Sequence, residues 1–178
     1  MSELEGNTIL TPDQIKRNVM IPIDPSEHCE RAFNWYFDNL YREGDEVIFV
    51  HVIEPVYNTP AFGMAMAAPV SVYDDLNRVM EGEIQQGKKL GQKYLHLAKE
   101  KNVHSRAFLH IEARPGHSLV KSARDHRSNI IVMGNRGIGT LRRTFLGSVS
   151  DYVLHHAHIP VVIIPPPGDG KDGSYEKM

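Results

Sequence analysis

Short apolar runs recur along the chain, and longer segments with apolar residues at helical spacing separate them. Runs of this kind, bounded by polar residues and rich in Val, Ile and Phe, are typical of β-strands. Four of the five runs lack a clean alternation of apolar and polar positions, as expected for strands that are covered on both faces of a sheet. The predicted strands span residues 17–23, 46–53, 105–111, 130–133 and 159–164.

The segments between these runs carry apolar residues three or four positions apart, which is the spacing of one helix face. The clearest such stripe begins at Cys29, and Gly44 is positioned to end that helix. A longer helix is predicted over 74–101, where three glycines weaken it locally by roughly 1 kcal/mol each relative to alanine. Two shorter helices are expected after Pro115 and after Gly147.

The alternation of strands and helices predicts an α/β fold with right-handed crossovers. We expect a doubly wound five-stranded parallel sheet in the order 3-2-1-4-5, within a Rossmann-like or flavodoxin-like three-layer sandwich. In such a sheet, ligands bind outside the carboxyl ends of the strands at the point where the strand order reverses. This rule brings Asp24, after the first strand, beside Gly134, at the end of the fourth.

Residues 134–148, with the sequence GNRGIGTLRRTFLGS, form the most specific stretch of the chain. Glycine permits positive φ and close approach of a ligand to the backbone, and free N–H groups at a helix start favour an anion. The stretch is therefore suited to wrapping around phosphates. The alternative is a set of turn glycines that only connect a strand to a helix.

Two common phosphate-binding patterns do not fit this stretch. A P-loop needs Gly-Lys-Ser/Thr after its first glycine and four further residues, and GNRGIGT contains no lysine. The dinucleotide fingerprint needs a third glycine where Arg142 stands and an acidic residue at the end of the next strand, where Ile164 and Pro165 lie.

Asp24 has two predicted roles that do not exclude each other. In the sequence IDPSE it fits a helix N-cap, with Pro25 at the first helical position and Glu27 at the third. Its carboxylate could also accept hydrogen bonds from ribose hydroxyls.

Composition limits the class of protein and its partners. The chain has 178 residues, 41% of them hydrophobic, which suffices for one domain with a full core. We expect this domain over 16–166, with mobile tails over 1–15 and 167–178. A formal net charge of −2 gives no electrostatic footprint for nucleic acid.

No apolar run approaches the roughly 18 residues needed to span a bilayer, and the first residues lack signal-peptide features. The single cysteine cannot form an internal disulfide, which fits a reducing compartment. We expect a cytoplasmic protein that binds neither membranes nor nucleic acid.

Gly134, Gly137 and the pair Gly147-Ser148 complete the pattern G-x2-G-x9-G-S/T. Four segments accompany this pattern along the chain. They are VMIPIDPSEHCERAF, FVHVIEP, IIVMGNRG, which overlaps the start of the pattern, and IPVVIIP. With these segments, the chain resembles the ATP-binding branch of the universal stress protein family over about residues 17–166.

The resemblance implies an adenine-nucleotide site. Pro22, Asp24 and Val52 would surround the adenine and ribose, with main-chain contacts from Val52 to the base, and Ser148 would bind a phosphate. Family members often form homodimers through the last strand, so we expect a homodimer. The predicted nucleotide-binding residues are Pro22, Ile23, Asp24, Val52, Met133, Gly134, Arg136, Gly137, Gly147, Ser148 and Val149.

Charged residues in the loop and one long connection leave alternatives open. Arg136, Arg142 and Arg143 could compensate the charge of a triphosphate, or could be solvated surface residues. The connection over 54–73 is long for this fold. It could fold over the adenine, pack on a partner or be disordered.

Histidines 155, 156 and 158 do not predict a metal site, because neighbouring positions point to different helix faces and no Cys or carboxylate completes a ligand spacing. A divalent ion, Mg²⁺ or Mn²⁺, would arrive on the nucleotide phosphates.

Two functions follow from these features. The first is an ATP-binding regulatory protein of the stress response, with AMP or ADP as alternative ligands. The second is a slow ATP hydrolase or nucleotidyl-transfer enzyme, which would need a base to position water and a cation on the γ-phosphate. Because no such base is evident near the loop, we expect binding with weak or no hydrolysis.

Overall fold

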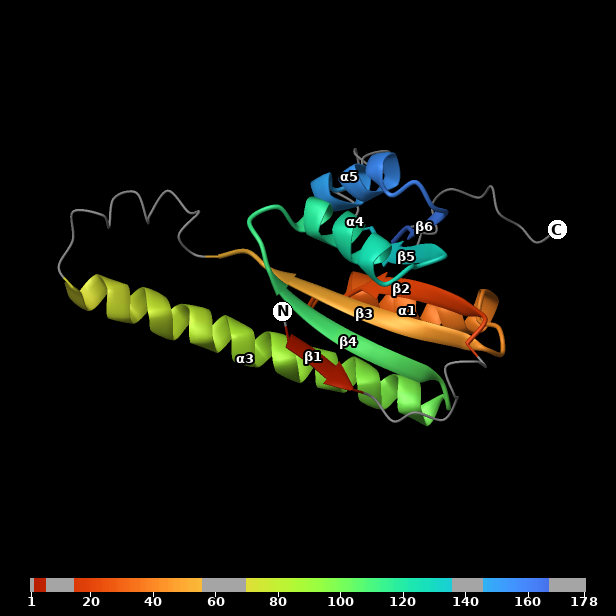
Figure 1. Ribbon diagram of the computed structural model, residues 1–178, viewed down its shortest axis with the longest axis horizontal. Helices are drawn as coiled ribbons and strands as arrows, with labels where there is room; N and C mark the ends of the chain where they lie inside the picture. The colour runs from red at the N-terminus through yellow and green to blue at the C-terminus, as the bar shows by residue number, and fades with distance from the viewer. Residues whose placement is uncertain (1, 6–14, 56–69, 136–145, 167–178) are drawn as a thin grey trace.

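A central β-sheet with the strand order β1-β4-β3-β2-β5-β6 organises the computed structural model (Figure 1). The structure describes residues 2–5, 15–55, 70–135 and 146–166. Five strands are parallel to their neighbours, which confirms the predicted order 3-2-1-4-5. These strands are β2 (Arg17–Pro22), β3 (Asp45–Ile53), β4 (His104–Ile111), β5 (Ile130–Gly134) and β6 (Val161–Ile164).

A sixth strand, β1 (Ser2–Glu5), lies antiparallel to β4 at the edge of the sheet, with Ser2 opposite Leu109 and Glu5 opposite Arg106. The sequence predicts a tail there and no strand. Four residues are too few to show a hydrophobic period, and pairing of main-chain N–H and C=O groups does not depend on one. Apart from residues 2–5 and Ile15, the predicted tails 1–15 and 167–178 lie outside the described residues.

Helices cover both faces of the sheet, as the doubly wound prediction requires (Figure 1). The sheet and the helices α1 and α3 enclose one hydrophobic cluster, and the helices α4 and α5 enclose a second cluster on the opposite face. The helices are α1 (Glu27–Asn39), α3 (Val70–Glu100), α4 (Pro115–Asp125) and α5 (Ser148–His156).

Gly44 does not end α1, contrary to the prediction. The helix finishes at Asn39, and Gly44 lies in the turn before β3 with a φ of 92°. A positive φ is costly for residues with a Cβ, so glycine is required by this turn and not by the helix end.

Aromatic rings fill the first cluster. Phe33 of α1 contacts Tyr94 of α3 with a distance of 5.5 Å between ring centroids. Phe49 of β3 lies beneath both rings, 6.0 Å from Phe33 and 5.4 Å from Tyr94 between centroids. This packing fixes α1 against the sheet and thereby fixes the position of its amino end.

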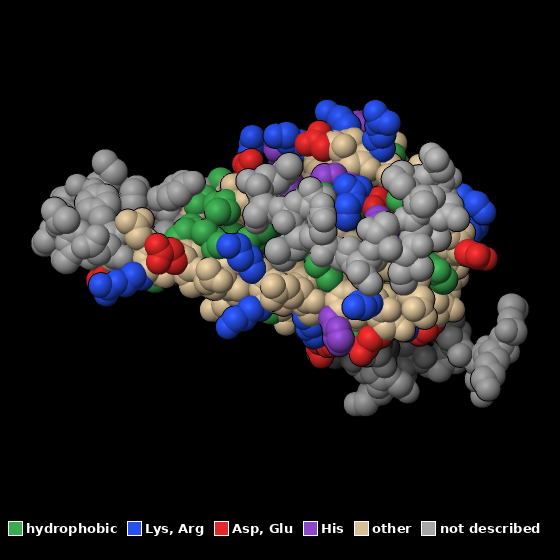
Figure 2. All heavy atoms as spheres, turned by 60° about the horizontal axis from the view of Figure 1, so that its bottom comes forward, with side chains coloured by type: hydrophobic (Ala, Val, Ile, Leu, Met, Phe, Trp, Pro, Cys, Tyr) green, Lys and Arg blue, Asp and Glu red, His purple; other side chains and the backbone are tan. Residues whose placement is uncertain are grey.

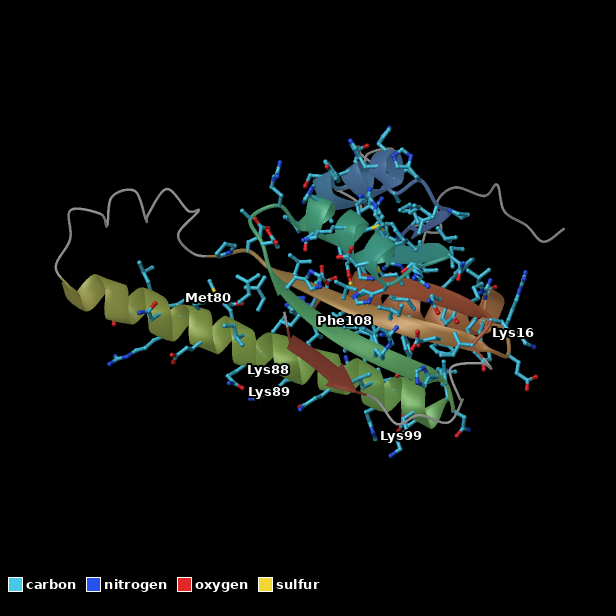
Figure 3. All side chains as sticks on the ribbon, in the orientation of Figure 1. Lys16, Met80, Lys88, Lys89, Lys99 and Phe108 are labelled. Carbon is cyan, nitrogen blue, oxygen red and sulfur yellow. The ribbon has the colours of Figure 1, made fainter. Side chains whose placement is uncertain are left out.

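The first turns of α3 extend beyond the edge of the sheet (Figure 1). Met80 lies on this projecting part, and Lys88, Lys89 and Lys99 follow along the helix (Figure 3). Figure 2 shows Lys and Arg interspersed with Asp and Glu on the visible face, without one basic patch. None of the helices in the described ranges combines the length and apolarity that crossing a bilayer requires.

Candidate functional site

A pocket of about 340 Å³ opens where the strands β2, β3 and β5 end. Its walls include the first residues of three helices: Ser26 and His28 at α1, Pro115 at α4, and Ser148 at α5. From β2 the chain adds β3 and β4 on one side of the sheet, and β5 and β6 on the other side, so the strand order reverses between β2 and β5. The pocket therefore lies at the predicted switch point. The amino ends of helices carry partial positive charge, and three of them meeting at one pocket favour an anionic ligand.

Most of the predicted site residues meet in this pocket, although they come from four separate segments. Gly147 is the N-cap of α5 and does not line it. Arg136 and Gly137 lie outside the described residues, as do Arg142 and Arg143. The predicted residues that line the pocket are Pro22, Ile23, Asp24, Val52, Met133, Gly134, Ser148 and Val149.

Asp24 is not the N-cap of α1, which corrects one of its two predicted roles. The N-cap is Ser26, and the helix begins at Glu27. Oδ1 of Asp24 accepts a hydrogen bond from the Ser26 N–H at 2.8 Å. Aspartate readily forms this local turn two residues ahead, which competes with capping the helix directly. The turn holds the carboxylate at the pocket wall.

The thiol of Cys29 also donates to Oδ1 of Asp24, at 3.1 Å, and the side chain is buried. Burial, and then the negative charge of Asp24, raise the pKa of this thiol to about 12. Cys29 therefore stays protonated at neutral pH and helps to fix the orientation of Asp24.

We expect the native Cys29 thiol to react with an aromatic disulfide reagent at pH 8 at least about thirtyfold more slowly than in the unfolded chain, because the higher nucleophilicity of a thiolate of higher pKa offsets part of the loss in thiolate. Only the thiolate reacts, and the pKa rises from 9.0 to about 12 on folding. Absorbance of the released thiolate measures the rate with and without denaturant. Asp24→Asn removes one cause of the shift and should speed the native reaction; equal rates in the native and unfolded wild type would contradict this account.

Gly134 has a packing role that the sequence does not reveal. A Cβ at this position would meet the carbonyl oxygen of His28 and lie 2.6 Å from its carbonyl carbon. The end of β5 therefore touches the backbone of α1 directly. At Gly147, by contrast, an added Cβ would meet only Oγ of Ser150 among the described residues, at 3.6 Å, so their packing does not require glycine there.

Several further residues line the pocket that sequence reasoning did not select. His51 is an example: its Nδ1–H donates to the carbonyl oxygen of Ile23 at 2.8 Å, which ties β3 to the chain beyond β2. The position of His51 directly before Val52 was the signal in the sequence that could have identified it. The lining residues of α4 had no such signal, because the approach of α4 to the pocket depends on tertiary packing. The unselected lining residues include Ser26, His28, Cys29, His51, Glu54 and Leu119.

Within the described ranges, no group of three or more His, Cys, Asp or Glu side chains is arranged to hold a metal ion. The Nδ1–H of His155 donates to the carbonyl oxygen of Asp151 at 2.8 Å. The ring of His156 stacks on Tyr152, with 4.0 Å between centroids.

The order of the strands and a pocket at their carboxyl ends define an α/β protein with a ligand site at the topological switch point. A model of the universal stress protein family matches residues 16–165. The chain therefore belongs to the universal stress protein family.

The matches to known proteins extend over most of the chain. The chain is 29% identical over 177 residues to universal stress protein PHOS32 of Arabidopsis thaliana, a match that spans 89% of this chain and 68% of the relative. The fold matches that of hypothetical protein MJ0577, with a TM-score of 0.68, 22% identity and coverage of 87% of this chain and 99% of the other.

Two similar solved structures contain nucleotides. An Arabidopsis thaliana family protein, At3g01520, has AMP bound; its TM-score is 0.61 and its identity 19%, over 89% of this chain and 97% of the other. A universal stress protein from Archaeoglobus fulgidus is in complex with dAMP, with a TM-score of 0.60 and 18% identity, over 84% of this chain and 98% of the other. At these identities the likeness establishes a common fold.

Proposed function

We propose that this chain is an ATP-binding universal stress protein that acts as a nucleotide-dependent regulatory protein of the stress response, with weak or no ATP hydrolysis. One observation carries the proposal: the pocket at the switch point is lined by residues that the sequence predicts to contact a nucleotide, and these residues come from four separate segments of the chain. Three helix amino ends at the same pocket supply the partial positive charge that a phosphate chain needs.

The ligand is an adenine nucleotide, with ATP first and AMP or ADP as alternatives. Asp24 accepts hydrogen bonds from ribose hydroxyls, Val52 offers main-chain contacts to the base, and Ser148 binds a phosphate at the start of α5. The AMP and dAMP complexes of proteins with the same fold support this choice. Mg²⁺ or Mn²⁺ enters on the phosphates, whose oxygens are suitable ligands for either ion.

Binding without efficient turnover fits the side chains of the pocket. Asp24 is engaged by Ser26 and Cys29, and the raised pKa of Cys29 keeps its thiol protonated. Neither group is therefore a ready base or nucleophile for phosphoryl transfer.

A homodimer through β6 is part of the same proposal. β6 pairs with β5, and Val161, Val162 and Ile163 are only half-buried within a single chain. An apolar edge of this kind tends to pair with another strand. Sedimentation equilibrium should give the mass of two chains, and a mass of one chain at micromolar concentration would contradict this part.

Substituting Gly147 with valine should abolish detectable ATP binding and leave the fold intact. The described residues leave room for a side chain at this position, so the expected stability cost is only about 1 kcal/mol, from replacing a tolerated N-cap residue by a poor one. The side chain would block the backbone approach to the phosphates. Gly137→Val, outside the described residues, is expected to act in the same way.

Isothermal titration calorimetry with ATP and circular dichroism on both variants measure binding and fold. Mass spectrometry of small molecules released from freshly purified wild-type protein identifies the natural ligand. Unchanged ATP affinity in both variants would refute the assigned site. Multiple-turnover phosphate release from the wild type would favour the hydrolase instead.

A further inference from the structure

A side-chain pair on α1 joins the pocket to the beginning of the glycine-rich stretch. Nη2 of Arg31 donates to the carbonyl oxygen of Asn135 at 2.9 Å and to Nδ1 of His28 at 3.2 Å. Asn135 is buried and directly follows Gly134 at the end of β5. Arg31 therefore connects α1 to the backbone where the predicted phosphate-binding residues begin.

The bond between Arg31 and His28 determines which nitrogen of His28 carries the proton. A guanidinium group has only donors, so Nδ1 of His28 must be the acceptor. A neutral imidazole has one N–H, and it is then on Nε2. His28 lines the pocket, so this Nε2–H belongs to a residue of the pocket wall.

The backbone around His28 is held rigidly. Its carbonyl group lies against Gly134 so closely that no Cβ fits between them. A donor on such a fixed element loses little freedom when it binds a ligand, which favours specific recognition. The contact also places His28 at the end of the pocket formed by β5.

Arg31 acts through His28 and is not among the residues that line the pocket. Its two hydrogen-bond partners are neutral, and it forms no ion pair with the carboxylates of the described residues. Its Nε is buried and has no hydrogen-bond partner in the described part of the chain. Arg31 is half-buried and lines a separate hollow beside Glu27 and Glu30, so we assign it no direct contact with the ligand.

We propose that His28 is a second phosphate-binding residue of this pocket, beside the end of β5, and that Arg31 is its positioning residue. Nε2–H of His28 donates to a phosphate oxygen of the nucleotide. Arg31 holds the required tautomer of His28. This inference rests on the proposed function for the identity of the ligand.

Calorimetry with AMP and with adenosine, on the wild type and on His28→Ala, His28→Gln and Arg31→Met, tests the phosphate contact. His28→Ala should weaken AMP binding about tenfold, because a hydrogen bond to a charged oxygen is lost, and should leave adenosine binding unchanged. His28→Gln should retain most of the affinity, since its amide nitrogen can replace Nε2. The double variant His28→Ala/Arg31→Met should be no weaker than His28→Ala alone.

Matched controls carry the same substitutions on the exposed side of α3. His96 and Arg78 have side chains that are 72% and 81% exposed, so His96→Ala and Arg78→Met should bind AMP like the wild type. Equal AMP affinity in His28→Ala and the wild type would overturn the inference and leave the proposed function standing. An equal loss of AMP and adenosine binding in His28→Ala would also overturn it.

A readout without ligand separates this inference from the proposed function. Long-range ¹H–¹⁵N spectra of the imidazole rings should show His28 as the Nε2–H tautomer in the wild type and a mixture of tautomers in Arg31→Met. A protein that binds neither AMP nor ATP would refute the proposed function and the phosphate contact. A mixture of tautomers in the wild type would refute the positioning role of Arg31.

Discussion

Replacing Gly134 with alanine is expected to lower the free energy of unfolding by about 3 kcal/mol, as severe overpacking does. The new Cβ would overlap the carbonyl group of His28, which belongs to the backbone and cannot rotate away. Either α1 or the end of β5 has to move, and both elements are held by buried cores. Urea denaturation followed by circular dichroism measures the change.

Gly82→Ala is the matched control. Gly82 lies within α3, and a Cβ there would meet no atom of the described residues within 4 Å. Alanine is the better helix former, so this variant should gain about 0.5–1 kcal/mol. Similar stabilities for the two variants would mean that the contact between Gly134 and α1 is not as close as the structure has it.

Asp45→Ala is expected to cost about 3–5 kcal/mol, the range seen when one partner of a buried ion pair is removed. Asp45 is 2% exposed. Its Oδ1 accepts from Nε of Arg17 at 2.8 Å, and its Oδ2 accepts from the hydroxyl of Tyr36 at 2.7 Å. Alanine would leave a buried hydroxyl and a half-buried guanidinium without their acceptor, which carries a desolvation cost.

The pair between Glu30 and Lys93 provides the contrast, because these side chains are 50% and 51% exposed. Exposed ion pairs contribute little, so Glu30→Ala should change stability by at most about 0.5 kcal/mol. Denaturant unfolding of both variants at the same pH makes the comparison. A loss below 1 kcal/mol in Asp45→Ala would contradict the expected role of burial.

Residues whose roles depend on local pattern were predictable from the sequence. The apolar runs and the helix stripe from Cys29 gave the order of elements, and the general rule for parallel sheets then placed Asp24 beside Gly134. Both line the same pocket. This inference needs only the periodicity of the elements and the handedness of their connections.

Roles that depend on tertiary contacts were not predictable. Asp24 lies within a local sequence that fits an N-cap, and the turn to Ser26 prevails because the chain enters α1 from the end of β2. Arg31 reaches Asn135 only because α1 packs beside β5. Gly134 resembles a ligand-binding glycine in the sequence, and its contact with His28 appears only when both backbones are in place.

The short antiparallel strand β1 affects how copies of this chain can assemble. It occupies the outer side of β4, so the long strand at that end of the sheet already has a neighbour. Continuous fibrils by edge-to-edge addition need a sheet that can be extended at two ends. β1 itself is then the edge at that end, and its four residues offer a shorter row of unpaired N–H and C=O groups than the eight residues of β4, so this segment disfavours open-ended polymerisation.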